Sequence, residues 1–156
     1  METAVLANPL KISEIDIVYR NEIKAKDRPK IKRSQDAYEI LKSVWDMNKI
    51  ELVEQFKILL LNVRGACLGV SDIGLGGLKQ VVADQKVIFA IALKAGANSI
   101  VLAHNHPSGS TEPSPQDKNL TAQMKRAGDI LDVKIWDHLI VTPDSYYSFA
   151  DNGLMP

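Results

Sequence analysis

The sequence has few of the features that mark secreted or membrane proteins. It has one cysteine, Cys67, so no disulfide can form within the chain, which is typical of a reducing cytosol. No apolar run is long enough to span a bilayer. Residues 1–9 have neither the basic start nor the long apolar core of a signal peptide. We therefore expect a cytoplasmic protein with no membrane partner.

The chain also lacks an excess of charge of either sign. Its 19 basic residues balance 19 acidic ones, which gives a net charge of zero. A surface that binds phosphate backbones usually carries excess positive charge, so this balance argues against general nucleic-acid binding. One local exception is residues 24–33, where six basic residues accompany one acid. We interpret this run as a solvated connector, with contact to DNA or an acidic partner as the alternative.

The chain does have enough apolar sequence for a hydrophobic core: 46% of its 156 residues are apolar. Periodicity and turn residues predict strands over 11–20, 56–63, 67–73, 98–103, 133–141 and 146–149. They predict helices over 34–46, 84–95 and 115–131. In the first helix, Ser34 is the expected cap and Val44 belongs to the apolar stripe. This alternation of strands and helices predicts an α/β sandwich.

The helix expected over 84–95 is apolar nearly all round. Its inward face is predicted to carry Val87, Ile88, Ile91 and Ala92, with Phe89 and Leu93 on another side. Such a helix is buried either between layers or against another subunit. A homo-oligomer is therefore left open.

The most informative stretch follows the apolar run 99–103. Of three histidines in the chain, His104 and His106 lie here, and Asp117 follows after ten intervening residues. Side chains two residues apart on an extended backbone point the same way, so both imidazoles can face one point. Two nitrogens and one oxygen would leave one position open on a tetrahedral zinc, which is the catalytic arrangement. The alternative is an ordinary strand end whose rings bond backbone carbonyls.

Residues 114–117 are also typical of a helix start. Ser114 would be the N-cap, Pro115 the first helical residue and Asp117 the third residue after the cap. This interpretation is compatible with the metal site, because it would hold Asp117 rigidly in a helix that returns toward the histidines.

The spacing also carries a resemblance. His104-Asn105-His106-Pro107, six residues, Ser114, two residues and Asp117 resembles the JAMM metal motif of the JAB/MPN metalloproteases, and Asn105 with Ser108-Gly109 is similar to the RadC-like bacterial branch. The similarity continues over 56–62, 137–141 and 147–149. It implies a curved mixed β-sheet flanked by helices, a cytidine-deaminase-like three-layer sandwich. The implied domain is 49–156, with 1–48 as a strand, connector and helix that pack on it or extend it.

The resemblance further implies a set of roles. One zinc ion per chain would be held by His104, His106 and Asp117. Glu54, two residues before Phe56, would be the base, and Ser114 would stabilise the oxyanion. Glu51 competes with Glu54, but on an extended chain the two would face opposite ways. The implied activity is zinc-dependent hydrolysis of an amide bond in a peptide or protein, by a peptidase or isopeptidase.

Three features fall outside this pattern. His138 is interpreted as a buried histidine bonded to a neighbour, with a supporting role at the site or a substrate contact as the alternative. Gln85 stands where the branch often has an arginine. Longer RadC-like proteins carry an N-terminal helix-hairpin-helix region, and residues 1–48 have no such signature.

A DNA-repair-associated factor and a non-catalytic interaction module, using the helix over 84–95, are the alternative functions.

Overall fold

The apolar run that starts at Phe56 forms β1 (Gln55–Leu61), in which every residue is buried. The computed structural model describes residues 13, 15, 16, 18–76 and 83–156. β1 pairs antiparallel with β2 (Cys67–Leu75) on one side and with β3 (Ser99–Asn105) on the other. β3 pairs parallel with β4 (Lys134–Val141), and β4 pairs antiparallel with β5 (Tyr146–Ser148). The result is a mixed sheet in the order β2-β1-β3-β4-β5.

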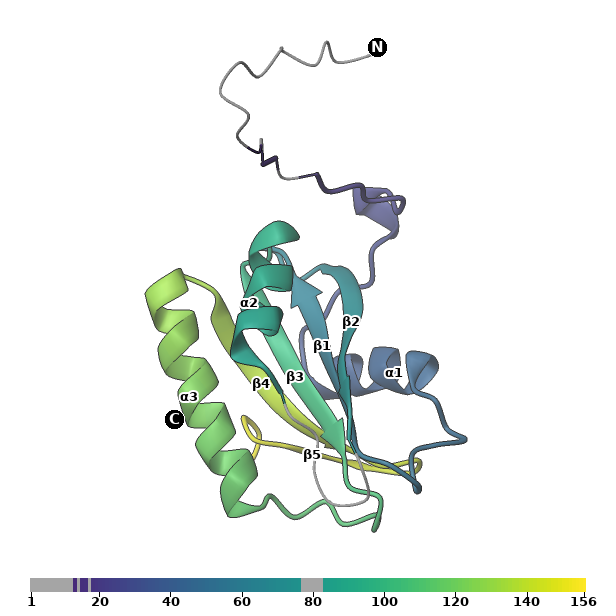
Figure 1. Cartoon of the computed structure of the whole chain (residues 1–156). Helices are drawn as coiled ribbons and strands as arrows, with labels where there is room; N and C mark the ends of the chain where they lie inside the picture. The colour runs from purple at the N-terminus through teal and green to yellow at the C-terminus, as the bar shows by residue number, and fades with distance from the viewer. Residues whose placement is uncertain (1–12, 14, 17, 77–82) are drawn as a thin grey trace.

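Helices cover both faces of this sheet (Figure 1). α1 (Ser34–Val44) lies on one face, and α2 (Gln85–Lys94) and α3 (Pro115–Leu131) lie on the other. Because side chains alternate along a strand, Leu59 of β1 packs in the cluster that includes α1, whereas Ile58 packs with α2 and α3. This arrangement confirms the predicted α/β class with a mixed sheet flanked by helices.

The same alternation decides where the functional side chains lie. β3 is the central strand and is buried along its whole length. Its even-numbered residues Ile100 and Leu102 face α2 and α3, so His104 lies on that face as well. The parallel pairing of β3 with β4 requires a crossover, and α3 provides it. The first turn of α3 therefore follows the strand end that carries the histidines.

α1 differs from the prediction at its first and last residues. Its N-cap is Arg33, and Asp36 accepts hydrogen bonds from the backbone N–H groups of Lys32 and Arg33. Ser34 is instead the first helical residue and donates its hydroxyl to Asp151. Val44, expected in the apolar stripe, is exposed. The helix packs on the sheet through Ala37, Tyr38 and Leu41. The proposed boundary near residue 48 stays a prediction.

The orientation of α2 also differs from the prediction. Ile88, Phe89 and Ala92 are buried against the sheet, whereas Val87 is exposed. The assignment of Val87 to the inward face and of Phe89 to another side was therefore wrong. In a helix that is apolar nearly all round, the sequence pattern does not fix the rotation, and packing against a single sheet face decides it.

Residues 11, 12, 14 and 17 of the predicted strand over 11–20 lie outside the described residues. The residues of this range that the structure describes, 13, 15, 16 and 18–20, have no regular secondary structure, so the strand is not found there. The basic run that follows contains a short 3-10 helix, η1 (Ala25–Asp27). A bridge joins Lys30 of this run to Ala66, the residue before β2. Among the described residues, no helix is both long and apolar enough to cross a membrane.

Candidate metal centre

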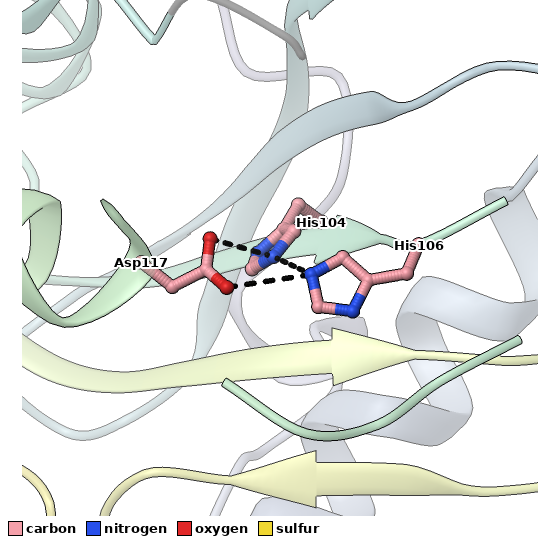
Figure 2. Close-up of side chains that lie close together, drawn as sticks. All are labelled: His104, His106 and Asp117. Atoms are coloured by element: carbon pink, nitrogen blue, oxygen red, sulfur yellow. Dashed lines mark hydrogen bonds and ion pairs between the residues drawn. The ribbon is translucent and has the colours of Figure 1, made fainter. Parts of the chain in front are cut away.

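Three side chains converge at the end of the central strand (Figure 2). His104 lies near the end of β3, His106 follows directly after it, and Asp117 lies in the first turn of α3. His104 Nε2 is 3.0 Å from His106 Nε2 and 3.2 Å from Asp117 Oδ1. His106 Nε2 is 3.3 Å from Asp117 Oδ2. Within the described part of the chain, no other group of three histidine, cysteine or acidic side chains could share an ion.

A capping box holds Asp117 in this position. Ser114 Oγ accepts a hydrogen bond from the Asp117 N–H at 3.1 Å, and Asp117 Oδ2 accepts one from the Ser114 N–H at 2.7 Å. Pro115 is the first helical residue, as the sequence predicts. Because the carboxylate bonds the turn from which it projects, it points toward the histidines with little freedom. The predicted helix start is therefore confirmed.

The hydrogen bonds of His106 show which of its nitrogens faces the cluster as an electron-pair donor. His106 Nδ1 lies 2.9 Å from the carbonyl oxygen of Ser110, which can only accept, so Nδ1 carries the proton. In the neutral ring, Nε2 then presents a lone pair toward Asp117 and His104. Lone pairs this close together repel one another unless a cation lies between them. A positive charge bound between these atoms would therefore stabilise the cluster.

The spacing of these atoms suits zinc. Zinc–nitrogen and zinc–oxygen bonds of about 2.0–2.1 Å at tetrahedral angles would place the ligand atoms about 3.3 Å apart. The two nitrogens are 3.0 Å apart, and each lies 3.2 or 3.3 Å from a different oxygen of Asp117, which is close to that value. Two imidazole nitrogens and one carboxylate oxygen would leave the fourth position open.

The pKa values within the cluster show the same preference for positive charge. Burial alone would raise the pKa of Asp117, but hydrogen bonds from His104 and His106 and the positive charge of His104 hold it well below its usual range. The hydrogen bond to Asp117 raises the pKa of His106, against the opposing effect of burial. Asp117 is thus ionised at neutral pH and attracts a cation, either a proton or a metal ion.

Glu54 lies between a turn and β1. Residues 47–52 form the turn, and the half-buried Glu54 directly precedes the strand. The Glu54 carbonyl accepts a hydrogen bond from the Gly76 N–H at 2.8 Å. The negative charge of Glu54 contributes to the raised pKa of His106, after the larger effect of Asp117. Glu51 is exposed in the turn. The expectation that the two glutamates share an extended chain was therefore wrong.

His138 on β4 is the hydrogen-bond partner of His104 on the side away from the cluster. Its Nε2 lies 2.9 Å from His104 Nδ1, and its Nδ1 lies 2.7 Å from the hydroxyl of Thr121. The ring is completely buried and stacks on Phe149 with centroids 4.8 Å apart. Burial, and then the charge of His104, lower the pKa of His138 well below its ordinary value. The predicted buried, hydrogen-bonded histidine is thus also a direct partner of the cluster, with no exposed surface for a substrate.

The family model of the RadC-like JAB domain matches residues 31–154. This chain belongs to the RadC-like JAB domain family. The match confirms the resemblance carried by the motif between His104 and Asp117.

Relatives of this RadC-like JAB domain occur in several bacteria. A UPF0758 protein of Flavobacterium johnsoniae is 41% identical over 126 residues, which cover 80% of this chain and 53% of the relative. A UPF0758 protein of Chlorobaculum parvum is 35% identical over 127 residues, covering 81% and 55%. One from Porphyromonas gingivalis is 41% identical over 103 residues, covering 65% and 45%. The chain thus spans about half the length of these relatives, and their shared name states no activity.

Asn105 has a structural role in this RadC-like JAB domain that the sequence did not reveal. Its side chain is fully buried and donates to the carbonyls of Ile50, at 2.6 Å, and Val53, at 3.0 Å. It also accepts a hydrogen bond from the Gln55 N–H at 2.8 Å. These three bonds tie β3 to the segment that carries Glu54. The available signal was an amide at the end of a buried apolar strand, because buried amides require partners.

Two further polar residues have structural partners. Gln85, the departure from the branch pattern, donates to Gln123 at 2.8 Å and so joins α2 to α3. Asp137, next to His138, accepts hydrogen bonds from the Ser148 hydroxyl at 2.6 Å and the Ala150 N–H at 2.9 Å. Burial raises the pKa of Asp137 in spite of these bonds. Asp137 therefore joins β4 to the chain segment behind the site.

Proposed function

We propose that this RadC-like JAB domain is a zinc-dependent hydrolase of amide bonds, a peptidase or isopeptidase. The observation that carries the proposal is the convergence of His104, His106 and Asp117 at separations that suit zinc, with one ligand position left over. The family supports it, since JAB domains are typically metallohydrolases.

His104, His106 and Asp117 would hold one zinc ion per chain. When bound, the ion supplies Lewis acidity and lowers the pKa of a coordinated water to about 7. Amide hydrolysis then requires a group that takes a proton from the attacking water and delivers it to the leaving nitrogen. Glu54 is the proposed base, because it lies two residues before Phe56, the partner of His104 in the sheet, and its negative charge acts on His106.

Ser114 is the proposed donor to the substrate carbonyl. The helix cap uses a lone pair of Ser114 Oγ and not its proton, so the hydroxyl can still donate. Capping and oxyanion stabilisation are therefore compatible. A single such donor is worth about 3 kcal/mol in other hydrolases.

The test combines metal analysis with an amidase assay on fluorogenic peptide amides and isopeptide-linked peptides. We expect about one zinc per chain in the unaltered protein and in Glu54→Gln, and none in His104→Ala or Asp117→Ala. Glu54→Gln should lose hydrolysis, whereas the control Glu51→Gln should keep it. Absence of zinc from the unaltered protein would overturn the proposal. Full hydrolysis by Glu54→Gln would overturn only the assignment of the base.

Two alternatives give different results in these tests. A DNA-associated factor would rely on the exposed basic side chains within 24–33. Such a protein would show salt-dependent DNA binding that is lost when those charges are neutralised. An interaction module would use the exposed side of α2, where Val87 and Leu93 lie, and would be purified with almost no metal.

A further inference from the structure

A chain of buried hydrogen bonds leads away from the metal cluster and returns to it. His104 Nδ1 lies 2.9 Å from His138 Nε2, and His138 Nδ1 lies 2.7 Å from Thr121 Oγ1. Thr121 Oγ1 donates to the backbone carbonyl of Asp117 at 2.7 Å. The chain therefore starts at one proposed ligand and ends on the backbone of another. His138 and Thr121 are completely buried, so water does not replace any of these partners.

The carbonyl at the end of the chain determines the direction of every proton along it. A carbonyl oxygen can only accept, so the single hydroxyl proton of Thr121 is used on Asp117. Thr121 Oγ1 can then only accept from His138, which requires a proton on His138 Nδ1. A neutral His138 consequently has a lone pair on Nε2, and this atom accepts a proton from His104 Nδ1.

The surroundings of His138 keep its ring neutral. The ring stacks on Phe149 and lies 5.9 Å, between centroids, from Phe56. A charged imidazolium in such an apolar, fully buried position would lose its hydration without gaining a carboxylate partner on either ring nitrogen. His138 can therefore act as the acceptor that His104 requires.

We propose that Thr121 and His138 are positioning residues that hold His104 in the tautomer with its proton on Nδ1. In the neutral ring, His104 Nε2 is then presented as a lone pair toward His106 and Asp117. The inference rests on the proposed metal centre, because that lone pair is what a zinc ion would bind. Reversing the chain would put a proton on His104 Nε2 and close this ligand position.

The position of Thr121 in α3 gives it a second effect. It lies one helical turn after Asp117, so both residues project from the same side of the helix. Its hydroxyl thus joins His138 on β4 to the turn that carries Asp117. Two proposed ligands from different elements are held by one hydroxyl group.

The experiment measures zinc affinity and ring tautomers, and neither requires a substrate. Thr121→Val keeps the branched shape but removes the hydroxyl, whereas Thr121→Ser keeps the hydroxyl. Thr142→Val is the matched control, because Thr142 is similarly buried and its hydroxyl bonds only Ser145, in the turn between β4 and β5. Zinc affinity is measured by competition with a chromophoric chelator. Nitrogen-15 spectra of the unaltered metal-free protein report the tautomers of the three histidines directly.

We expect Thr121→Val to bind zinc about 10- to 100-fold more weakly than the unaltered protein, as found for other residues that orient metal ligands. Thr121→Ser and Thr142→Val should keep the unaltered affinity. The spectra should show His104 and His138 protonated on Nδ1. Unchanged zinc affinity in Thr121→Val, or a proton on His138 Nε2 in the unaltered protein, would overturn the inference. If Thr121→Val does not fold, the spectra of the unaltered protein decide alone.

The two proposals fail in different ways. If the unaltered protein binds no zinc, the proposed function is wrong, whatever the tautomers. If it binds zinc and Thr121→Val binds equally well, only the positioning role is wrong.

Discussion

Replacing Asn105 with alanine should destabilise the protein and loosen the segment that carries Glu54. The Asn105 side chain makes three buried hydrogen bonds to the segment 50–55, with Ile50, Val53 and Gln55 as partners. A hydrogen bond of this kind contributes about 1 kcal/mol to stability, so Asn105→Ala should lower the free energy of unfolding by about 3 kcal/mol. For a chain of this size, that loss corresponds to a decrease in Tm of roughly 6–12 °C.

The matched control is Asn62→Ala. Asn62 Oδ1 accepts two hydrogen bonds, from the Arg64 and Ala66 N–H groups, in the turn at the opposite end of β1. By the same arithmetic it should cost about 2 kcal/mol, or roughly 4–8 °C in Tm. It destabilises the same strand without releasing the segment that carries Glu54.

Calorimetry gives the two Tm values, and amide hydrogen exchange locates the effect. In Asn105→Ala, exchange should accelerate at residues 50–55, because local opening no longer breaks the three side-chain bonds. In Asn62→Ala, exchange at 50–55 should stay as in the unaltered protein. Equal exchange in both variants, or a Tm of Asn105→Ala within about 2 °C of the unaltered value, would refute the role of Asn105 in holding residues 50–55.

Two further predictions concern the elements that hold the site. Gly128→Ala should lower the urea midpoint, because the added Cβ would meet the Val133 carbonyl oxygen at 2.3 Å. This clash should outweigh the preference of a helix for alanine over glycine, which is about 1 kcal/mol. Gly69→Ala, where a Cβ would meet nothing within 4 Å, is the control, and a higher midpoint for Gly128→Ala would contradict this packing. The second concerns Asp137, whose pKa in the folded state is raised by burial. Above this pKa the buried carboxylate is ionised and lowers the stability of the fold, whereas below the pKa of the unfolded state Asp137 is protonated in both states and has no such effect. As the pH falls from 7 to 4, the free energy of unfolding of the unaltered protein should therefore increase relative to that of Asp137→Asn. Urea titrations that give the same difference between the two proteins at every pH would contradict this.

The central part of the fold could be predicted from sequence because its signals are local. The run 99–103 is apolar and too short for a helix, and Ser114, Pro115 and Asp117 occupy the three positions of a helix start. Both signals lie within a few residues of the structure that they determine. As a result, α3 has the predicted bounds, and the convergence of His104, His106 and Asp117 follows from strand alternation and one crossover.

The parts that could not be predicted depend on contacts between distant segments. Nothing near Asn105 in the sequence reveals that its amide bonds the carbonyls of Ile50 and Val53. Likewise, Thr121 is an ordinary helical residue in the sequence, and its role depends on β4, which places His138 beside its hydroxyl. The roles of Glu54 and Ser114 in a reaction stay predictions, because they depend on a substrate.

The origin of the site residues along the chain has a consequence for how the site matures. The proposed ligands lie between positions 104 and 117, whereas Glu54 directly precedes β1 and becomes fixed only when the ladder between β1 and β3 closes. Binding an ion at the proposed site would therefore require β3 and α3, together with His138 on β4, which bonds His104. In the proposed hydrolysis, use of the ion would also require Glu54 to be fixed by the pairing of β1, so a chain with only β3, α3 and β4 in place would hold metal without acting on a bond.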